Sequence, residues 1–178
     1  MAGSEPYPWP FDGDLGPACL ALVLAGWDDG WSSRVADPAA ARAACLELAL
    51  AVDRSGGLVV AVSHGTGVDP SSGPALPVEA LAVGAAGIDG FHGSPLDAVL
   101  RRARRSHLLV AGFGLEGPVH STLRSANDRG YECLLLTDAC AALVPELAAA
   151  SAHTVTMSGG IFGAVGTSAA AIAALDPT

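Results

Sequence analysis

The sequence predicts an α/β domain of three layers (α/β/α), in which helices cover both faces of a mostly parallel central sheet. Several segments of strand length are continuous apolar runs, which is typical of parallel strands that are buried on both faces. Ala-rich segments with helix start and stop signals alternate with these runs, and this order predicts right-handed β–α–β crossovers. Ligands of such sheets bind beyond the carboxyl ends of the strands, so we expect the functional site there.

The amino-terminal part is predicted to form an extended arm over residues 1–17, followed by a single domain over residues 18–178. Prolines alternate with aromatic side chains in the arm, which can lie on its own domain or on a neighbour. The first buried strand is predicted over residues 19–25. A helix then begins at Asp37-Pro38, because these residues supply an acidic N-cap and a proline at the first helical position, and it stops at the Ser-Gly-Gly of residues 55–57.

The same alternation is predicted to continue to the end of the chain. Residues 58–63 form the second buried strand. Residues 64–92 hold most of the Gly, Pro and Ser between elements, and irregular segments of this length are often functional or form interfaces. Further elements are predicted as a helix from Ser94-Pro95 to about Arg105, a strand over 108–111, a helix over 118–130, a strand over 132–137, a helix over 141–156, a strand over 161–165 and a helix over 167–175.

The charge balance excludes several classes of partner. A net charge of −9 argues against nucleic acid or an anionic membrane surface as a partner. The one basic cluster, residues 101–105, lies at the end of a predicted helix, where it complements the helix dipole. No apolar run approaches the ~20 residues of a membrane span, and residues 1–10 lack a basic-then-apolar signal pattern. We therefore expect a cytoplasmic protein that does not bind membranes.

Lysine and cysteine usage narrows the chemistry. The chain contains no lysine, so its nine Lys-plus-Arg residues are all arginine, and a mechanism that needs a lysine amine is excluded. The four cysteines lie inside apolar patterns without C-x-x-C spacing, which predicts buried thiols rather than disulfides or a metal site. These residues are Cys19, Cys45, Cys133 and Cys140.

Metal-binding motifs are also missing from the histidine and acidic residues. Their spacing gives neither H-x-x-x-H nor H-x-x-E. We interpret His92 and His107 as a loop residue and a strand-edge residue rather than as ligands. The sequence therefore predicts no metal ion and no cofactor.

The most informative segment is Gly112-Phe-Gly-Leu-Glu-Gly-Pro-Val-His-Ser-Thr122, which continues to Ala126-Asn-Asp-Arg-Gly-Tyr131. It follows the apolar run at residues 108–111 and opens an amphipathic helix. In this strand–turn–helix context an α/β enzyme presents a nucleophile at a helix N-terminus.

Several segments together resemble the isochorismatase-like cysteine hydrolases, in particular the branch that contains biuret hydrolase. The matching segments occur in the right order and cover almost the whole chain: Tyr7–Gly13, Gly87–Phe91, Gly93–Asp97, Gly112–Leu134 and Gly159–Gly163. The resemblance implies a Rossmann-like sandwich of the predicted kind. It also implies hydrolysis of amide-type C–N bonds, or in one case of an enol ether, by an Asp–Lys–Cys triad.

All three triad positions hold other residues here. The resemblance places Ala25 at the aspartate, Ala85 at the lysine and Pro118 at the cysteine. The absence of lysine supports the second loss independently of any alignment.

The physical consequence is loss of the covalent route. In the family, the cysteine attacks as a thiolate while backbone N–H groups hold the oxyanion, one of them beside a cis peptide that would here join Phe113 and Gly114. Pro118 supplies neither a thiol nor an N–H, and loss of one oxyanion donor alone costs roughly 10²–10³ in rate. Proline nevertheless fits the first turn of a helix, where its N–H would have no intrahelical partner.

The residues expected around the crevice divide into aromatic and polar sets. Trp27, Trp31, Phe91 and Phe113 are expected to line the crevice, where Trp27, Phe91 and Phe113 are candidate substrate-binding residues. These aromatic side chains are expected to fill the space that the triad vacates or to bury a subunit interface, in preference to forming a ligand-stacking pocket. A polar pocket is expected from Asp28, Asp29, His64, Glu116 and His120, of which all but Asp29 are candidate substrate-binding residues. We interpret Ser121 and Thr122 as helix-packing hydroxyls rather than as a replacement nucleophile.

Two functions remain open at this point. The first is a pseudoenzyme, a non-catalytic homologue that acts as a subunit of a homo-oligomer (dimer or tetramer) or of a hetero-oligomer with an active paralogue, or that binds a small amide or acid. The second is an active enzyme on amide-type or urea-type substrates with a rebuilt acid–base site that uses Glu116, Asp28 or His64. An open polar crevice would favour the second function, whereas a crevice filled by Trp27 and Phe91 would favour the first.

Overall fold

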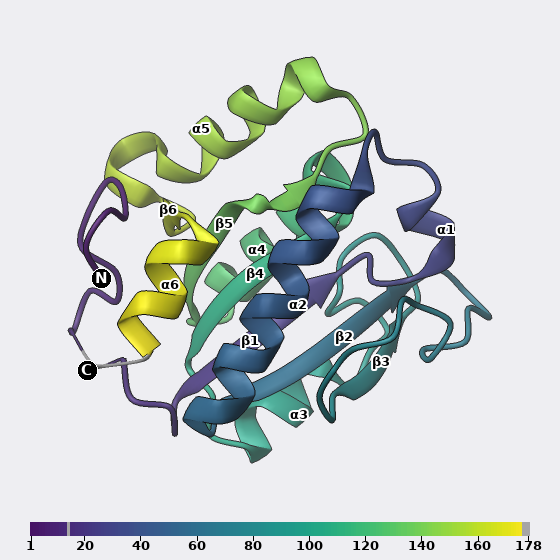
Figure 1. The fold of residues 1–178 in the computed structure, drawn as a ribbon, viewed down its shortest axis with the longest axis horizontal. Coiled ribbons are helices and arrows are strands. Elements are labelled where there is room, and N and C mark those ends of the chain that lie inside the picture. The colour runs from purple at the N-terminus through teal and green to yellow at the C-terminus, as the bar shows by residue number, and fades with distance from the viewer. Residues whose placement is uncertain (14, 176–178) are drawn as a thin grey trace.

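The computed structural model describes residues 1–13 and 15–175, and it contains a central sheet of six strands that are all parallel (Figure 1). The strands lie in the order β3-β2-β1-β4-β5-β6. Their bounds are β1 (Leu20–Ala25), β2 (Leu58–His64), β3 (Leu81–Ala85), β4 (His107–Phe113), β5 (Glu132–Ala141) and β6 (Ala164–Gly166). The chain reverses direction across the sheet between β1 and β4, so the carboxyl ends of these two strands form a switch point.

Helices cover both faces of this sheet, which confirms the predicted three-layer fold. In Figure 1, α2 and α6 lie in front of the sheet, whereas α3 and α4 lie behind it. The helical segments are α1 (Asp29–Ser32), α2 (Pro38–Ser55), α3 (Leu96–Arg102), a π-type turn η1 (Leu115–Val119), α4 (His120–Asp128), a 3₁₀ turn η2 (Pro145–Leu147), α5 (Ala148–Gly160) and α6 (Ser168–Leu175). Within the described residues, no helix has the length and apolar character that crossing a membrane requires.

The apolar run of β1 is continuous because both of its faces are buried. Leu22 and Leu24 point into the core under α2 and α6, whereas Ala21, Val23 and Ala25 point into the core under α3 and α4. All six residues of β1 are buried. Burial of this strand on both sides places its carboxyl end deep in the molecule.

The structure corrects several predicted boundaries. The segment predicted to be irregular, residues 64–92, contains β3. β5 continues to Ala141 through an irregularity in its pairing with β4, so the helix predicted from residue 141 begins only at Ala148. α5 then bends at residues 157–159, which have non-helical backbone angles, and for this reason β6 starts three residues later than predicted.

The amino-terminal arm lies on its own domain. Glu5 forms an antiparallel bridge with Val165 of β6, and the two backbone N–H···O bonds measure 2.9 and 2.8 Å. Trp9 is completely buried and packs edge-on against His107, with 5.9 Å between the ring centroids. These contacts decide between the two placements that the sequence left open.

Candidate functional site

Two of the three positions that the resemblance assigns to the triad, Ala25 and Pro118, lie together at the carboxyl edge of the sheet. Ala25 ends β1 between Val62 and Gly112, its partners on the neighbouring strands. The Cβ of Pro118 lies 3.5 Å from the point where a Cβ on Gly26 would stand, so the Pro118 ring packs against the residue that follows Ala25. The end of β1 and the turn after β4 therefore meet here.

The third position, Ala85, ends β3 and pairs with His64 at the end of β2. Ala25, Ala85 and Pro118 are all buried. None of these side chains carries a group that can ionise or donate a hydrogen bond. The three positions thus contribute only apolar surface to this edge of the sheet.

The sequence predicted Pro118 in the first turn of a helix. The structure instead places it inside the π-type turn η1, which directly precedes α4. Gly117 N donates to Gly114 O at 3.0 Å, and Val119 N donates to the same oxygen at 3.3 Å. Because the missing N–H of Pro118 falls between these two donors, the turn closes without it.

The prediction of a cis peptide between Phe113 and Gly114 is wrong. In the part of the chain that the structure describes, the cis bonds are Glu5–Pro6 and Trp9–Pro10. Gly114 N instead donates to Ala141 O at 2.9 Å, which joins the turn after β4 to the end of β5.

Aromatic side chains fill the space above the end of β1. Trp27 is 1% exposed and lies parallel to Phe113, with 4.9 Å between the ring centroids and an angle of 9° between the planes. Its Nε1 donates to Pro74 O at 2.8 Å, so the loop after β2 is fastened over the ring. This arrangement agrees with the space-filling interpretation of Trp27 and Phe113.

Phe91 does not join this pair, contrary to the prediction that it lines the same crevice. Its ring stacks on Tyr131 at a centroid distance of 5.9 Å, and the Arg129 guanidinium lies 4.7 Å from its centre. Phe91 belongs to the core under α3 and α4, whereas Trp27 and Phe113 belong to the core on the other face. The sequence order of these rings carries no information about the face on which each one lies.

The Asp28 carboxylate is occupied by backbone donors. Its Oδ1 accepts from Trp31 N at 2.9 Å and caps α1, while its Oδ2 accepts from His64 N at 3.0 Å. The residue is 2% exposed. Asp28 therefore joins the end of β1 to the end of β2.

Glu116 is held in the same manner on the other side of the switch point. Its two carboxylate oxygens accept from Leu143 N and Val144 N, each at 2.8 Å. His120, one turn further on, places its Nε2 2.7 Å from the Thr154 hydroxyl of α5. Glu116 and His120 thus contact α5 and the segment after β5, whereas Asp28 and His64 contact each other, and the predicted single polar pocket divides into two groups.

The surroundings of Thr122 confirm the prediction that its hydroxyl takes part in helix packing. It is 1% exposed and accepts a hydrogen bond from Gly90 N at 2.9 Å. The hydroxyl therefore fastens the loop after β3 to α4. Ser121, the other residue weighed as a nucleophile, is half-buried.

Comparison with known proteins shows to which family this chain belongs. The chain matches the model of the isochorismatase domain over residues 21–170. It belongs to the isochorismatase family. Among solved structures it is similar to a cysteine hydrolase from Pseudomonas syringae pv. phaseolicola 1448A, with a TM-score of 0.74, 20% identity, and coverage of 89% of this chain and 93% of that chain.

Two further structures show the same fold. An isochorismatase family protein from Burkholderia thailandensis has a TM-score of 0.74 and 24% identity, covering 89% of this chain and 96% of that chain. A nicotinamidase from Staphylococcus aureus has a TM-score of 0.69 and 14% identity, covering 84% of this chain and 99% of that chain.

Three of the four cysteines of this isochorismatase-family chain, Cys45, Cys133 and Cys140, lie in surroundings that disfavour the thiolate. Cys140 pairs with Gly112 across β4 and β5 and is the thiol nearest to the switch point in the strand register. Burial raises the pKa of Cys140 to about 12, and burial also raises the pKa values of Cys45 and Cys133 well above their ordinary range. Because the thiolate is the reactive form, these thiols do not supply a nucleophile at neutral pH.

His64 gives this isochorismatase-family domain a predicted pH dependence. Burial lowers the pKa of His64, against the opposing effects of the Gly87 carbonyl and of the Asp28 and Asp89 charges. As the pH falls through the ordinary value of about 6.5, the unfolded chain takes up a proton before the folded chain does, so stability is complete above this pH and decreases below it.

We expect the His64→Gln variant to show a shallower loss of unfolding free energy between about pH 7.5 and 5.5 than the wild type, because one titrating proton contributes at most about 1.4 kcal/mol per pH unit. Part of the slope will remain, since burial and Arg124 also lower the pKa of His120. Urea unfolding at each pH measures the effect, with the exposed His153→Gln as the control. Equal slopes for wild type and His64→Gln would contradict the prediction.

The sequence analysis missed a polar cluster at the amino edge of the sheet. Asp12, His107 and Glu132 come from the arm, β4 and β5, and their ligand-type atoms lie within 4.8 Å of one another. Glu132 begins one predicted strand and His107 directly precedes another, which is a signal that they could meet. No pattern in the sequence places the arm, and therefore Asp12, beside them.

Proposed function

We propose that this chain is a non-catalytic isochorismatase-family protein of the biuret-hydrolase-like branch, a pseudoenzyme without the Asp–Lys–Cys mechanism. The observation that carries the proposal is the Pro118 ring, which is buried at the switch point and packs against the residue after Ala25. The nucleophile and the base of the family would stand at these two positions. The chain has no lysine to replace the third member.

Each chemical step of the covalent route lacks its group. A carbonyl substrate would meet carbon atoms at Pro118 in place of a sulfur, so no thioester forms. The methyl group of Ala25 accepts no proton, and that of Ala85 carries no charge to stabilise an anion. Pro118 also removes the N–H that its position would contribute to an oxyanion hole.

The contacts of the remaining acids argue against a rebuilt acid–base site. Asp28 and Glu116 each use both carboxylate oxygens to accept backbone N–H groups, so these oxygens are already engaged in holding the backbone. The two acids also contact different segments. Both acids therefore hold neighbouring backbone segments in place and do not form a shared site.

As a non-catalytic protein, the chain would act through binding, and we propose that it serves as a subunit of a homo-oligomer or of a complex with an active paralogue. Four large apolar side chains between residues 144 and 161, in and beside η2 and α5, support this role, because each is between 44% and 51% exposed. They are Val144, Leu147, Met157 and Ile161. Native mass spectrometry of the purified chain tests the assembly and reveals any retained small amide or acid.

Ammonia release from biuret, urea, nicotinamide and carbamoyl amides tests the absence of catalysis. We expect the purified wild type to give the same background rate as the Asp28→Asn and Glu116→Gln variants. Turnover in the wild type that either substitution abolishes would contradict the proposal, since it would reveal an acid–base mechanism. Activity that is equal in all three proteins and varies between preparations would identify a contaminant.

A further inference from the structure

We propose that Asp12, His107 and Glu132 bind one divalent transition-metal ion, with zinc as the expected ion, at the amino edge of the sheet. This edge is opposite to the one that holds Ala25 and Pro118. The site is independent of the proposed loss of catalysis. Its role would be to fasten the arm to the strands β4 and β5.

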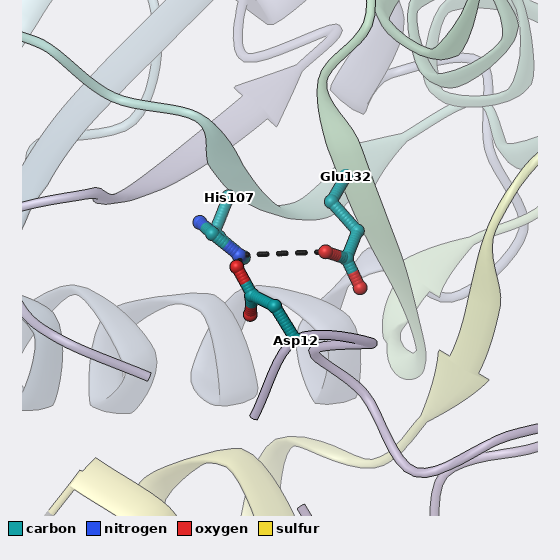
Figure 2. Close-up of side chains that lie close together, drawn as sticks. All are labelled: Asp12, His107 and Glu132. Carbon is teal, nitrogen blue, oxygen red and sulfur yellow. Dashed lines mark hydrogen bonds and ion pairs between the residues drawn. The ribbon is translucent and has the colours of Figure 1, made fainter. Parts of the chain in front are cut away.

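The fold brings the three side chains together from separate segments. His107 and Glu132 are the first residues of β4 and β5, and they are partners in the parallel register, so their side chains leave the sheet on the same face. Asp12 comes from the arm, which the Phe11 N–H holds in place by donating to Glu132 Oε1. Figure 2 shows both carboxylates next to the same end of the His107 ring.

The two distances from the His107 ring to the carboxylates fit a shared ion. His107 Nε2 lies 3.3 Å from Asp12 Oδ1 and 3.4 Å from Glu132 Oε2. A charge-assisted N–H···O bond is shorter, at about 2.7–2.9 Å. Two ligands that each bind tetrahedral zinc at about 2.0–2.1 Å lie roughly 3.3–3.4 Å apart, which is the spacing found here.

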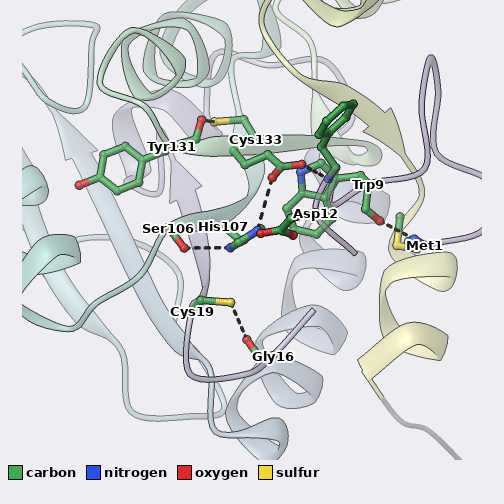
Figure 3. A network of polar contacts seen from close by, with 11 residues as sticks. Met1, Trp9, Asp12, Gly16, Cys19, Ser106, His107, Tyr131 and Cys133 are labelled. Carbon is green, nitrogen blue, oxygen red and sulfur yellow. Dashed lines mark hydrogen bonds and ion pairs between the residues drawn. The ribbon is translucent and has the colours of Figure 1, made fainter. Parts of the chain in front are cut away.

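The other ring nitrogen of His107 has its own partner. Nδ1 lies 2.9 Å from the Ser106 hydroxyl (Figure 3). If Nδ1–H donates to that oxygen, the lone pair of Nε2 faces the two carboxylates, as in a metal-bound histidine whose second nitrogen is fixed by a hydrogen bond. A divalent cation would then meet one imidazole nitrogen and two carboxylate groups.

Burial and donor type favour zinc over the hard cations. His107 is 6% exposed and packs edge-to-face with the Trp9 ring, so its imidazole is held in one orientation. Magnesium and calcium prefer all-oxygen sites, whereas a site of one imidazole and two carboxylates suits zinc and its neighbours in the transition series. Three protein ligands leave a fourth position for water.

Titration of the chelator-treated full-length protein with zinc chloride tests the site by calorimetry at pH 7.5. We expect one saturable site per chain and a melting temperature that rises with zinc concentration. His107→Gln and Glu132→Gln are expected to weaken binding by about tenfold or more, and Ser106→Ala by roughly 10–100-fold through loss of the ring orientation. His153→Gln, which removes an exposed imidazole on α5, should bind zinc like the wild type.

Two outcomes would overturn the proposal. One is the absence of saturable zinc binding to the wild type, which would mean that the cluster is a hydrogen-bonded clasp only. The other is zinc binding that His107→Gln and Glu132→Gln both leave unchanged, which would assign the ion to the cysteines or to another surface. Far-ultraviolet circular dichroism of each variant confirms that it is folded, and because the readout is metal affinity, the result stands apart from any assay of hydrolysis.

Discussion

The Trp27→Ala variant is expected to lose about 3–5 kcal/mol of unfolding free energy, the range for truncation of a buried tryptophan. Trp27 is almost completely buried, stacks on Phe113 at 4.9 Å and donates to Pro74 O at 2.8 Å. Truncation removes the stacking contact with Phe113 and leaves the Pro74 carbonyl without this donor. It also opens a cavity between the ends of β1 and β4 and the loop after β2. Urea unfolding followed by tryptophan fluorescence and circular dichroism measures the loss.

Two further variants separate the contributions at this position. Trp27→Phe keeps an aromatic ring against Phe113 and removes the indole N–H, so we expect a smaller loss of about 1–3 kcal/mol. Trp31→Ala, at a half-buried tryptophan four residues away, should also cost less than Trp27→Ala. The cavity in Trp27→Ala should bind indole or benzene and regain part of the melting temperature, as apolar cavities do. A loss no greater than that of Trp31→Ala would show that Trp27 does not fill a packed space.

The Gly26→Ala variant is expected to lose more than about 4 kcal/mol or to fail to fold, because a clash with backbone adds to backbone strain. Gly26 has a φ of 66°, and a Cβ there would stand 2.2 Å from the Phe113 carbonyl oxygen. That oxygen belongs to the last residue of β4, directly before the η1 turn. Urea unfolding, together with the soluble yield, measures the effect.

Gly56→Ala is the matched control for the strain alone. Gly56 also has a positive φ, 86°, but a Cβ there meets nothing within 4 Å. We expect it to lose only the roughly 1–2 kcal/mol of left-handed backbone strain. Equal losses for the two variants would contradict the close approach of β1 and β4 on which the site geometry depends.

The layers of the fold could be predicted because their signals are local. The apolar run of β1 is continuous since both faces of the strand are buried, and α2 carries a proline at its start and a glycine at its C-cap. β3 escaped prediction because it is a short edge strand, in which Leu81 is 44% exposed and only two of five residues are buried. Its run Leu-Ala-Val-Gly-Ala is apolar but consists mostly of small residues, and it lies within a segment rich in Gly, Pro and Ser that was predicted to be irregular.

The site was less predictable because its arrangement depends on which sheet face and which loop each side chain meets. The pairing of Trp27 with Phe113 was consistent with the sequence, whereas Phe91 packs on the other face, which no spacing encodes. Glu116 was expected to line a polar pocket, yet its oxygens bind the amides of Leu143 and Val144, which are nearly thirty residues away in the chain. Such long-range partners become visible only when β5 and η1 are placed side by side.

The bridge between Glu5 and Val165 has a consequence for self-association. An unprotected border strand offers its backbone amides and carbonyls as a template for a strand from a second molecule. At β6 these groups of Val165 are already engaged by Glu5, and a competing chain would have to peel the first residues away before it could add to the sheet. The arm therefore guards this border against edge-to-edge aggregation.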